Sequence, residues 1–554
     1  MTKALLGRPA VAKFGAWAAV AALAIAALPA ARACTSILVS RGASKDGSVI
    51  ITYSADAPFM PRLLRIPGGT HPPDAMVEVR GWEDDEVRGK VKQAPRTYTV
   101  VGLMNEHQLS LGETTTGGRH ELVDRKGQLD YDAMMLLTLQ RAKTAREAIA
   151  TIDALCKEYG YGASGETISI ADRDEAWIME LIGKGPGGRG IVWVAARVPE
   201  GYITSHANMS RITTFPLNDP DNWLYAPDVI SFAVEKGYYR TDSGKPFSYR
   251  DAYHPDQSPS QKRACAGRVW SICRRAAPSQ NYSDAYFRGA EGAEDYPLFV
   301  KPDKPLAVSD VMALMRDHYE GTPYDMTKGI DAGPYGSPLR LRDLAFTVDQ
   351  KKYMWERPIA TQQAGFVVVT QSRKALPDAI GGVTWFTPDE ASTSCFTPLY
   401  CSIGSLPAAY ERGDYQKFSW ESAWWVTNLV SNLAYDRWSR VYPDVRKAQE
   451  EQEGNLFRMQ PVIEEAAAKL AATDPALANT FLTNYSVSTG EAVFRRWQEV
   501  ASAILTKHVD GYLKNAKGHP SAPGYSAEWL REVVKSRPDQ FKLPENKKAE
   551  ETDH

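Results

Sequence analysis

The 554-residue sequence has little of several features that define protein classes. Its six cysteines are too few for a disulfide-rich scaffold, and no Cys-x-x-Cys or His-Glu-x-x-His motif predicts a zinc site. Basic and acidic residues nearly balance, 65 against 67, so no broad basic surface for nucleic acid is indicated. Beyond residue 33, no apolar run approaches the roughly 20 residues of a membrane span. We therefore expect no metal or other cofactor, no nucleic-acid partner and no stable membrane insertion of the mature chain; the oligomeric state stays open.

Residues 1–33 have the organisation of a secretory signal peptide. Three basic residues precede an apolar stretch over about residues 14–30, and Ala31-Arg32-Ala33 forms a small-x-small cleavage site. Removal of this segment would deliver a secreted or periplasmic protein. It would also leave Cys34 as the first residue, with a free α-amine.

A cysteine at the start of a mature chain joins a nucleophile to a base. The thiol can attack a carbonyl group while the α-amine, with an ordinary pKa of about 7.7–8.0, takes and returns the proton. A cysteine beside a cleavage site is also typical of lipoproteins, although Arg32 fits poorly where those have a small residue. The junction alone leaves both interpretations open. They exclude each other, because lipidation consumes the thiol and the amine.

The segments after Cys34 predict antiparallel strands with interleaved helices. Helices are expected over residues 131–140 and 144–158, and Thr144 with Glu147 forms a capping box at the start of the second. The glycine-rich segment 183–190 lacks the Gly-Lys-Ser/Thr ending of a phosphate loop and lies between two strands, so it predicts a hairpin tip. Strands or hairpins are predicted at residues 34–57, 96–115, 166–198, 201–208 and 345–372.

The remaining cysteines allow only limited disulfide formation. Cys265 and Cys273 lie in a predicted helix, where their Cα atoms would be roughly 12 Å apart, too far for a bridge. Cys395 and Cys401 lie in a loop-like segment and are the better candidates. With Cys34 as nucleophile, five cysteines remain, so at least one of them stays free.

The composition changes near residue 407, after which amphipathic helical patterns dominate. We therefore divide the chain into a signal peptide at 1–33, a catalytic domain at 34–407, a helical C-terminal region at 408–537 and a disordered tail at 538–554. Strands that pack on strands, with helices outside, would bury the core of an α+β fold.

Several separated blocks resemble the dipeptidase family of N-terminal-nucleophile cysteine hydrolases, whose more distant relatives are penicillin V acylases and bile salt hydrolases. The blocks cover nearly the whole mature chain. The resemblance implies a four-layer αββα sandwich and hydrolysis of dipeptides or short peptides through a thioester. The blocks include CTSILVSRGASKDGSVIITYSAD, MNEHQLSLGETTTGGRHELVD, GASGETISIADRDEAWIMELIGKG and SHANMSRI.

The same resemblance assigns catalytic roles by position. Cys34 is the expected nucleophile, and Asp56 would hold its protonated amine. Asn208 would stabilise the oxyanion. Arg268, with Arg211 as its rival, would lower the pKa of the thiol or hold Asp56 in place.

Two positions depart from the acylase pattern. Tyr53 stands where the acylases have an arginine, and Thr115 stands near their oxyanion asparagine. Glu113, Thr114 and Thr115 are further candidates for lining a substrate pocket. His206, beside Asn208, is expected to be structural, because the α-amine already fills the role of a base.

Two other functions remain as alternatives. The same chemistry on a different substrate would give an amidase for N-acyl amides such as penicillin V. A lipid-anchored, non-enzymatic binding protein would have Cys34 blocked.

Overall fold

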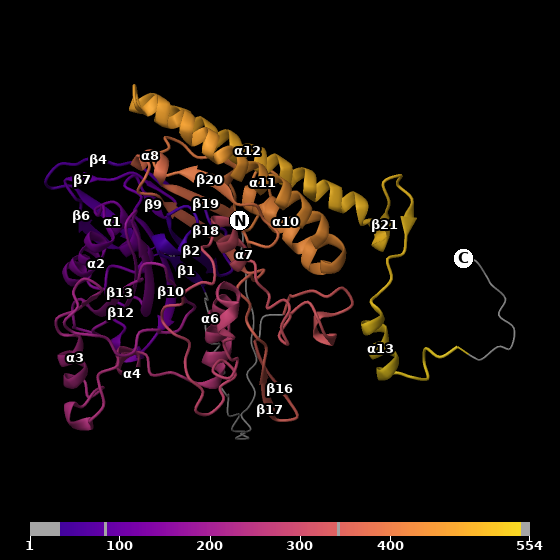
Figure 1. Cartoon of the computed structure of the whole chain (residues 1–554), viewed down its shortest axis with the longest axis horizontal. Helices are drawn as coiled ribbons and strands as arrows, with labels where there is room; N and C mark the ends of the chain where they lie inside the picture. The colour runs from indigo at the N-terminus through magenta and orange to yellow at the C-terminus, as the bar shows by residue number, and fades with distance from the viewer. Residues whose placement is uncertain (1–33, 82–85, 341–343, 544–554) are drawn as a thin grey trace, which may run out of the picture. The chain divides into compact units, whose positions relative to one another are not determined.

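The computed structural model describes residues 34–81, 86–340 and 344–543 (Figure 1). The predicted signal peptide and residues 544–554 of the predicted tail lie outside the described residues. Within the described ranges, no helix combines the length and apolar character that crossing a bilayer requires.

The smaller of two large sheets carries the start of the predicted catalytic domain. All its strand pairs are antiparallel, and its β1 lies between β14 and β2, with Ser36 opposite His206. The strands, in spatial order, are β14 (Ile203–His206), β1 (Ser36–Val39), β2 (Val49–Asp56), β18 (Ala364–Ser372), β19 (Val383–Pro388) and β20 (Thr397–Tyr400).

The larger sheet is antiparallel as well and contains the predicted hairpins of the middle of the chain. The glycine-rich segment 183–190 joins β12 to β13, which confirms the predicted hairpin tip. The strands, in spatial order, are β15 (Trp223–Tyr225), β13 (Ile191–Arg197), β12 (Ala176–Gly183), β11 (Gly165–Ala171), β10 (Ser110–Gly117), β9 (Met104–Asn105), β8 (Val100–Val101) and β3 (Arg65–Ile66).

Buried polar side chains join the two sheets. The His206 ring on β14 makes hydrogen bonds of 2.7 Å to Thr114 on β10 and 2.7 Å to Ser169 on β11. Burial lowers the pKa of His206 to about 3, so the ring is neutral and has one donor and one acceptor nitrogen for these hydroxyls. Thr370 on β18 donates to Ser110 on β10 at 3.1 Å. These pairs connect strands that the chain places far apart.

Several of the described helices pack on the larger sheet. They include α1 (Tyr131–Leu139), which contacts β10, α2 (Ala145–Tyr159), which contacts β11, β12 and β13, and α3 (Val229–Glu235), which contacts β13. Thr144 caps α2 as predicted, accepting from the Glu147 N–H at 3.2 Å. The Glu147 carboxylate reaches back to the N–H of Lys143, one residue before the predicted partner.

Other helices pack on the smaller sheet, and a helical C-terminal region is confirmed. The long helices α11 and α12 run side by side in Figure 1, and both contact β20, while α10 contacts β19. Earlier in the chain, α6 contacts β14 and α7 contacts β18. The boundary at residue 407 stays a prediction. The bounds are α6 (Gly267–Ala276), α7 (Val308–Leu314), α10 (Ala423–Asp436), α11 (Trp438–Ala471), α12 (Pro475–Lys507) and α13 (Ala527–Ser536).

The described residues thus form an α+β structure with antiparallel sheets. Short elements complete it. They are β4 (Gly69–Thr70), β5 (Met76–Arg80), β6 (Val87–Lys92), β7 (Arg96–Thr97), α3 (Val229–Glu235), α4 (Tyr249–Tyr253), α5 (Pro259–Gln261), the π-helical turn η4 (Lys262–Ala266), β16 (Ala345–Val348), β17 (Lys351–Met354), α8 (Asp378–Gly381), α9 (Ala408–Glu411), β21 (Leu513–Lys514) and β22 (Pro520–Ser521).

All six cysteines are buried and free, so Cys395 and Cys401, the better candidates for a bridge by sequence, are not joined. The segment between them is not a loop. It forms β20, and its four extended residues span roughly 13 Å, beyond the reach of a disulfide. The Cys401 thiol instead contacts the carbonyl oxygen of Asp378 at 3.2 Å.

Candidate active site

Cys34 lies directly before β1 and is buried. Its backbone nitrogen donates to Oδ1 of Asn208 at 2.9 Å, and its carbonyl oxygen accepts from Nη1 of Arg268 at 2.7 Å. The next residue, Thr35, is bound to Ser54 of β2 through two hydrogen bonds of 3.1 Å. The backbone of Cys34 is therefore fixed on both sides of its thiol.

Asn208 follows β14 and has a φ of 57°, in the left-handed region that asparagine tolerates better than most residues. Its Oδ1 accepts from Cys34 and from Nη2 of Arg268, the latter at 2.9 Å. Its Nδ2 donates to the carbonyl oxygen of Thr115 at 2.8 Å. Since its backbone carbonyl also accepts from Gln261 at 2.8 Å, the orientation of the amide is closely defined.

Arg268 lies in the first turn of α6, after the π-helical turn η4, and is fully buried. π-helical turns inside helices are frequent at functional sites. The guanidinium group has five N–H donors in a fixed plane, and here they connect α6 to the start of β1 and the end of β14. The acceptors are the carbonyl oxygens of Cys34 (2.7 Å), Ala207 (3.2 Å) and Ala264 (3.0 Å), Oγ1 of Thr35 (3.0 Å) and Oδ1 of Asn208 (2.9 Å).

Arg211, the alternative candidate to Arg268, contacts a different set of residues. Arg211 pairs with Asp295 at 3.2 Å and donates to the carbonyl oxygens of Tyr296 and Pro297. Of the two arginines, only Arg268 hydrogen-bonds to Cys34 among the described residues.

Asp56 ends β2 and is buried. Its Oδ2 lies 3.3 Å from Nη2 of Arg357. Burial raises the pKa of Asp56 to about 6, against the opposing effect of Arg357 and Arg268. The nitrogen of Cys34 donates to Asn208 and not to Asp56. In the full-length chain that nitrogen is a peptide N–H.

Sequence reasoning did not identify Arg357. It stands alone in the segment MWERPIA, with no motif around it and 301 residues after Asp56. Only the missing positive charge at Tyr53 signalled that the site needs another cation. Arg268 and Arg357 bring positive charge to Asp56 from elements distant in sequence.

The surroundings of the Cys34 thiol are acidic. Its Sγ lies 3.6 Å from Oε1 of Glu113, and the hydroxyl of Tyr53 donates to the same oxygen. Burial raises the pKa of the Cys34 thiol well above its usual value, and the carboxylates of Glu113 and Asp56 raise it further. The thiol is therefore protonated here, and attack on a carbonyl requires a base to remove its proton.

The three predicted pocket residues are placed differently. The Glu113 side chain reaches Cys34, whereas Oγ1 of Thr114 is bound to His206 between the sheets. Thr115 contributes its backbone carbonyl to Asn208. Neighbouring residues of a strand point to opposite sides, so Thr114 cannot share the direction of Glu113.

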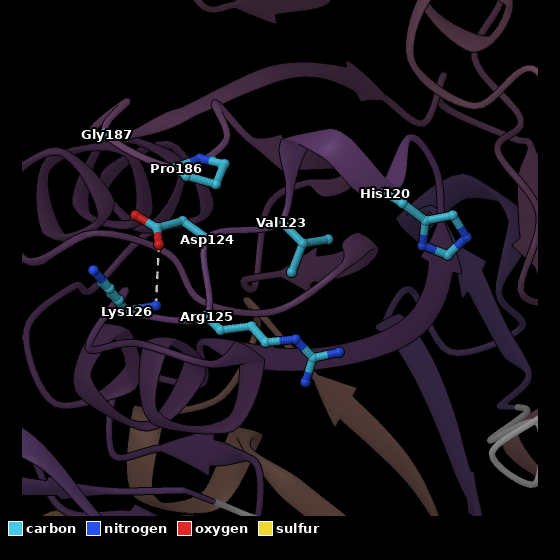
Figure 2. Close-up of a pocket in the computed structure, with 7 residues that line it drawn as sticks. All are labelled: His120, Val123, Asp124, Arg125, Lys126, Pro186 and Gly187. Carbon is cyan, nitrogen blue, oxygen red and sulfur yellow. Dashed lines mark hydrogen bonds between the residues drawn. The ribbon is translucent and has the colours of Figure 1, made fainter.

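A cavity of about 460 Å³ lies elsewhere on the molecule, lined by residues of two loops. Figure 2 shows its side chains, including Asp124, which accepts from the backbone N–H of Lys126 at 3.0 Å. Among the described residues, none of its lining residues hydrogen-bonds to Cys34, Asp56, Asn208 or Arg268. The candidate reaction centre is assigned to Cys34, which is not among the residues that line this cavity. The lining residues are His120, Val123, Asp124, Arg125, Lys126, Pro186 and Gly187.

Comparison with known proteins identifies related sequences. The model of "Peptidase family C69" matches residues 63–451, more than half of the chain. "Dipeptidase A" of Lactobacillus helveticus is 25% identical over 450 residues, covering 76% of this chain and 85% of that protein. "Probable dipeptidase" of Latilactobacillus sakei is 25% identical over 492 residues, covering 82% and 92%. "Dipeptidase" of Bifidobacterium longum (strain NCC 2705) is 24% identical over 481 residues, covering 80% and 84%.

Proposed function

The chain belongs to peptidase family C69, and from this we propose that it is a secreted cysteine dipeptidase with Cys34 as its nucleophile. The expected resemblance to dipeptidases is confirmed. The observation that carries the proposal is the position of Cys34, whose nitrogen and carbonyl oxygen are held by Asn208 and Arg268 beside an ion pair.

The proposed reaction is acyl transfer to the thiol. After removal of residues 1–33, the α-amine of Cys34 takes the thiol proton, and Sγ attacks the carbonyl carbon of the peptide bond. The amine then gives the proton to the leaving nitrogen, which departs as the amine of the second amino acid. A thioester between Cys34 and the first amino acid remains. Water, activated by the same amine, hydrolyses it and restores the thiol.

Asn208 receives a different role from the expected one. Its Oδ1 already faces the nitrogen of Cys34, so we assign it the orientation of the α-amine. Its Nδ2 donates to Thr115, which leaves it less suited to the oxyanion. Arg268 binds the carbonyl oxygen of Cys34 and Oδ1 of Asn208 through its two terminal nitrogens, and Arg357 pairs with Asp56. A rigid nucleophile is the condition for a productive approach of the substrate.

We further propose that the two sheets and their helices form the four-layer αββα sandwich of N-terminal-nucleophile hydrolases. Support comes from the side-chain hydrogen bonds between the sheets and from helices that contact each sheet. Secretion or export to the periplasm is proposed from the signal-like sequence of residues 1–33.

Substitution of the nucleophile tests the function. Cys34→Ala should abolish release of amino acids from a panel of dipeptides. Cys156→Ala is the matched control, because its buried thiol contacts Met134 at 3.7 Å, in the helices that cover the larger sheet. Full activity of the Cys34→Ala protein would contradict the mechanism. Extension of the mature chain by one alanine before Cys34 should inactivate as well, because an amide nitrogen is not basic.

A further inference from the structure

We propose that Glu113, paired with Glu166, binds the free α-ammonium group of the substrate and so selects peptides with an unblocked N-terminus. This inference rests on the proposed function and names its substrate class. It assigns to two buried carboxyl groups a role in recognition.

Geometry places Glu113 where that ammonium group must lie. A reacting carbonyl carbon approaches its nucleophile to about 3–3.5 Å before the bond forms. In a dipeptide, the α-nitrogen is two covalent bonds from that carbon. Since Oε1 of Glu113 is 3.6 Å from Sγ of Cys34, a carbonyl at the thiol brings the ammonium group within reach of the carboxylate. The hydroxyl of Tyr53 holds this oxygen in position.

Glu166 gives the site its charge balance. It lies opposite Thr115 on β11, diagonally across from Glu113, and is fully buried. Its carboxyl group interacts with the side chains of Glu113 and Thr115. Burial raises the pKa of Glu166, and the carboxylate of Glu113 raises it further. Two buried carboxyl groups this close disfavour a double negative charge, and a single negative charge on the pair would match one ammonium group.

Two further carboxyl groups, Asp130 and Asp132, interact electrostatically with Glu113 and Glu166. Burial, together with the charges of Asp130 and Glu113, raises the pKa of Asp132 to about 7. Asp130 also contributes to the raised pKa of Glu166. The positive groups at the site, Arg268 and Arg357, act on Asp56 instead. A cationic substrate group is therefore favoured on the Glu113 side of the thiol.

Binding of an ammonium group there also affects the nucleophile. The charge of Glu113 is one cause of the raised pKa of the Cys34 thiol. An ammonium group beside Glu113 cancels that charge and makes the thiol easier to deprotonate. An N-acylated peptide has no such charge, so it loses both the binding contact and the activation. This distinguishes a dipeptidase from an amidase that acts on N-acyl amides.

The test compares Ala-Ala with N-acetyl-Ala-Ala as substrates of the chain that begins at Cys34. Charge-assisted hydrogen bonds are worth about 1.5–3 kcal/mol, which corresponds to roughly 10–150-fold in binding. Glu113→Gln should therefore raise KM for Ala-Ala by about that factor, while kcat/KM for N-acetyl-Ala-Ala falls less or rises. Glu121→Gln, which removes an exposed carboxylate in the segment after β10, is the matched control.

A second readout follows the free thiol. In the absence of substrate, the pH dependence of Cys34 alkylation by iodoacetamide should move to lower pH in Glu113→Gln, because a negative neighbour is gone. If Glu113→Gln does not fold, Tyr53→Phe, which frees the Glu113 carboxylate, should narrow the preference for Ala-Ala over N-acetyl-Ala-Ala.

The results separate this inference from the proposed function. An equal loss on both substrates, or an unchanged preference in Glu113→Gln, would overturn the role of Glu113 while leaving Cys34 as nucleophile. If the unsubstituted enzyme cleaves neither substrate, or if cleavage survives the Cys34→Ala substitution, the proposed function itself is overturned.

Discussion

Oδ1 of Asn208 lies 2.9 Å from the backbone nitrogen of Cys34. The contact joins the end of β14 to the residue before β1, 174 positions apart in the chain. It places a hydrogen-bond acceptor next to the nitrogen that becomes the α-amine when residues 1–33 are removed. The orientation of that amine toward its own thiol then depends on a side chain that is itself held by Arg268 and Thr115.

Two substitutions of Asn208 separate the contribution of its side-chain acceptor from that of its left-handed backbone conformation. Asn208→Gly keeps the left-handed φ of 57° without strain and removes the acceptor, so kcat should fall about 100-fold. Stability should fall as well, because Arg268 and Thr115 each lose a buried hydrogen-bond partner. Asn208→Ala should lose the same activity and be less stable, because alanine disfavours that φ. Steady-state kinetics and thermal unfolding measure the two effects. Normal kcat in Asn208→Gly would rule out the positioning role.

Arg268 and Arg211 form a matched pair of buried arginines. Arg268→Lys should lower kcat at least 10-fold, because a lysine cannot supply five planar donors to Cys34, Asn208 and their neighbours. Arg211→Lys should mainly lower stability, since its partners lie around Asp295. The measurement is kcat for a dipeptide together with the midpoint of unfolding. Equal loss of kcat in both variants would argue against a special role for Arg268.

Asp56 predicts a specific pH dependence. Its pKa is raised from 3.8 to about 6, so between these values the folded protein holds a proton that the unfolded chain has lost. The free energy of unfolding should therefore decrease as pH rises from about 4 to 6, by at most about 3 kcal/mol from this group. Asp56→Asn should abolish that decrease in denaturant unfolding measured across this range. A slope unchanged by the substitution would show that Asp56 does not titrate there.

His206 provides a test of the contact between the sheets. His206→Ala leaves the buried hydroxyls of Thr114 and Ser169 without their partner, so stability should fall by about 2–4 kcal/mol. At a temperature where the variant is folded, kcat should stay close to that of the unsubstituted enzyme. A large loss of kcat with unchanged stability would instead identify His206 as a participant in the reaction.

Much of the local structure could be predicted from the sequence. The helix at α2 follows from its cap at Thr144, and the hairpin tip at 183–190 follows from its glycines between two strands. Asn208 and Arg268 were found through a family pattern, and the structure brings both to Cys34.

Other features depend on tertiary contacts that no local pattern encodes. Arg357 reaches Asp56 across 301 positions of the chain, and only the folded sheet brings the two together. Whether Cys395 and Cys401 are bridged could not be decided from the sequence, because the strand β20 between them has the sequence pattern of a loop. Thr114 was grouped with Glu113 by adjacency, although its hydroxyl binds His206 and only the Glu113 side chain reaches Cys34.

The most direct test of Cys34 as a free N-terminal nucleophile is the intact mass of active enzyme exported by its native host. We predict a mass equal to that of an unmodified chain beginning at Cys34, with dipeptidase activity in the same sample. A mass increased by lipid at Cys34, or full activity in a chain that begins before it, would contradict the proposed mechanism.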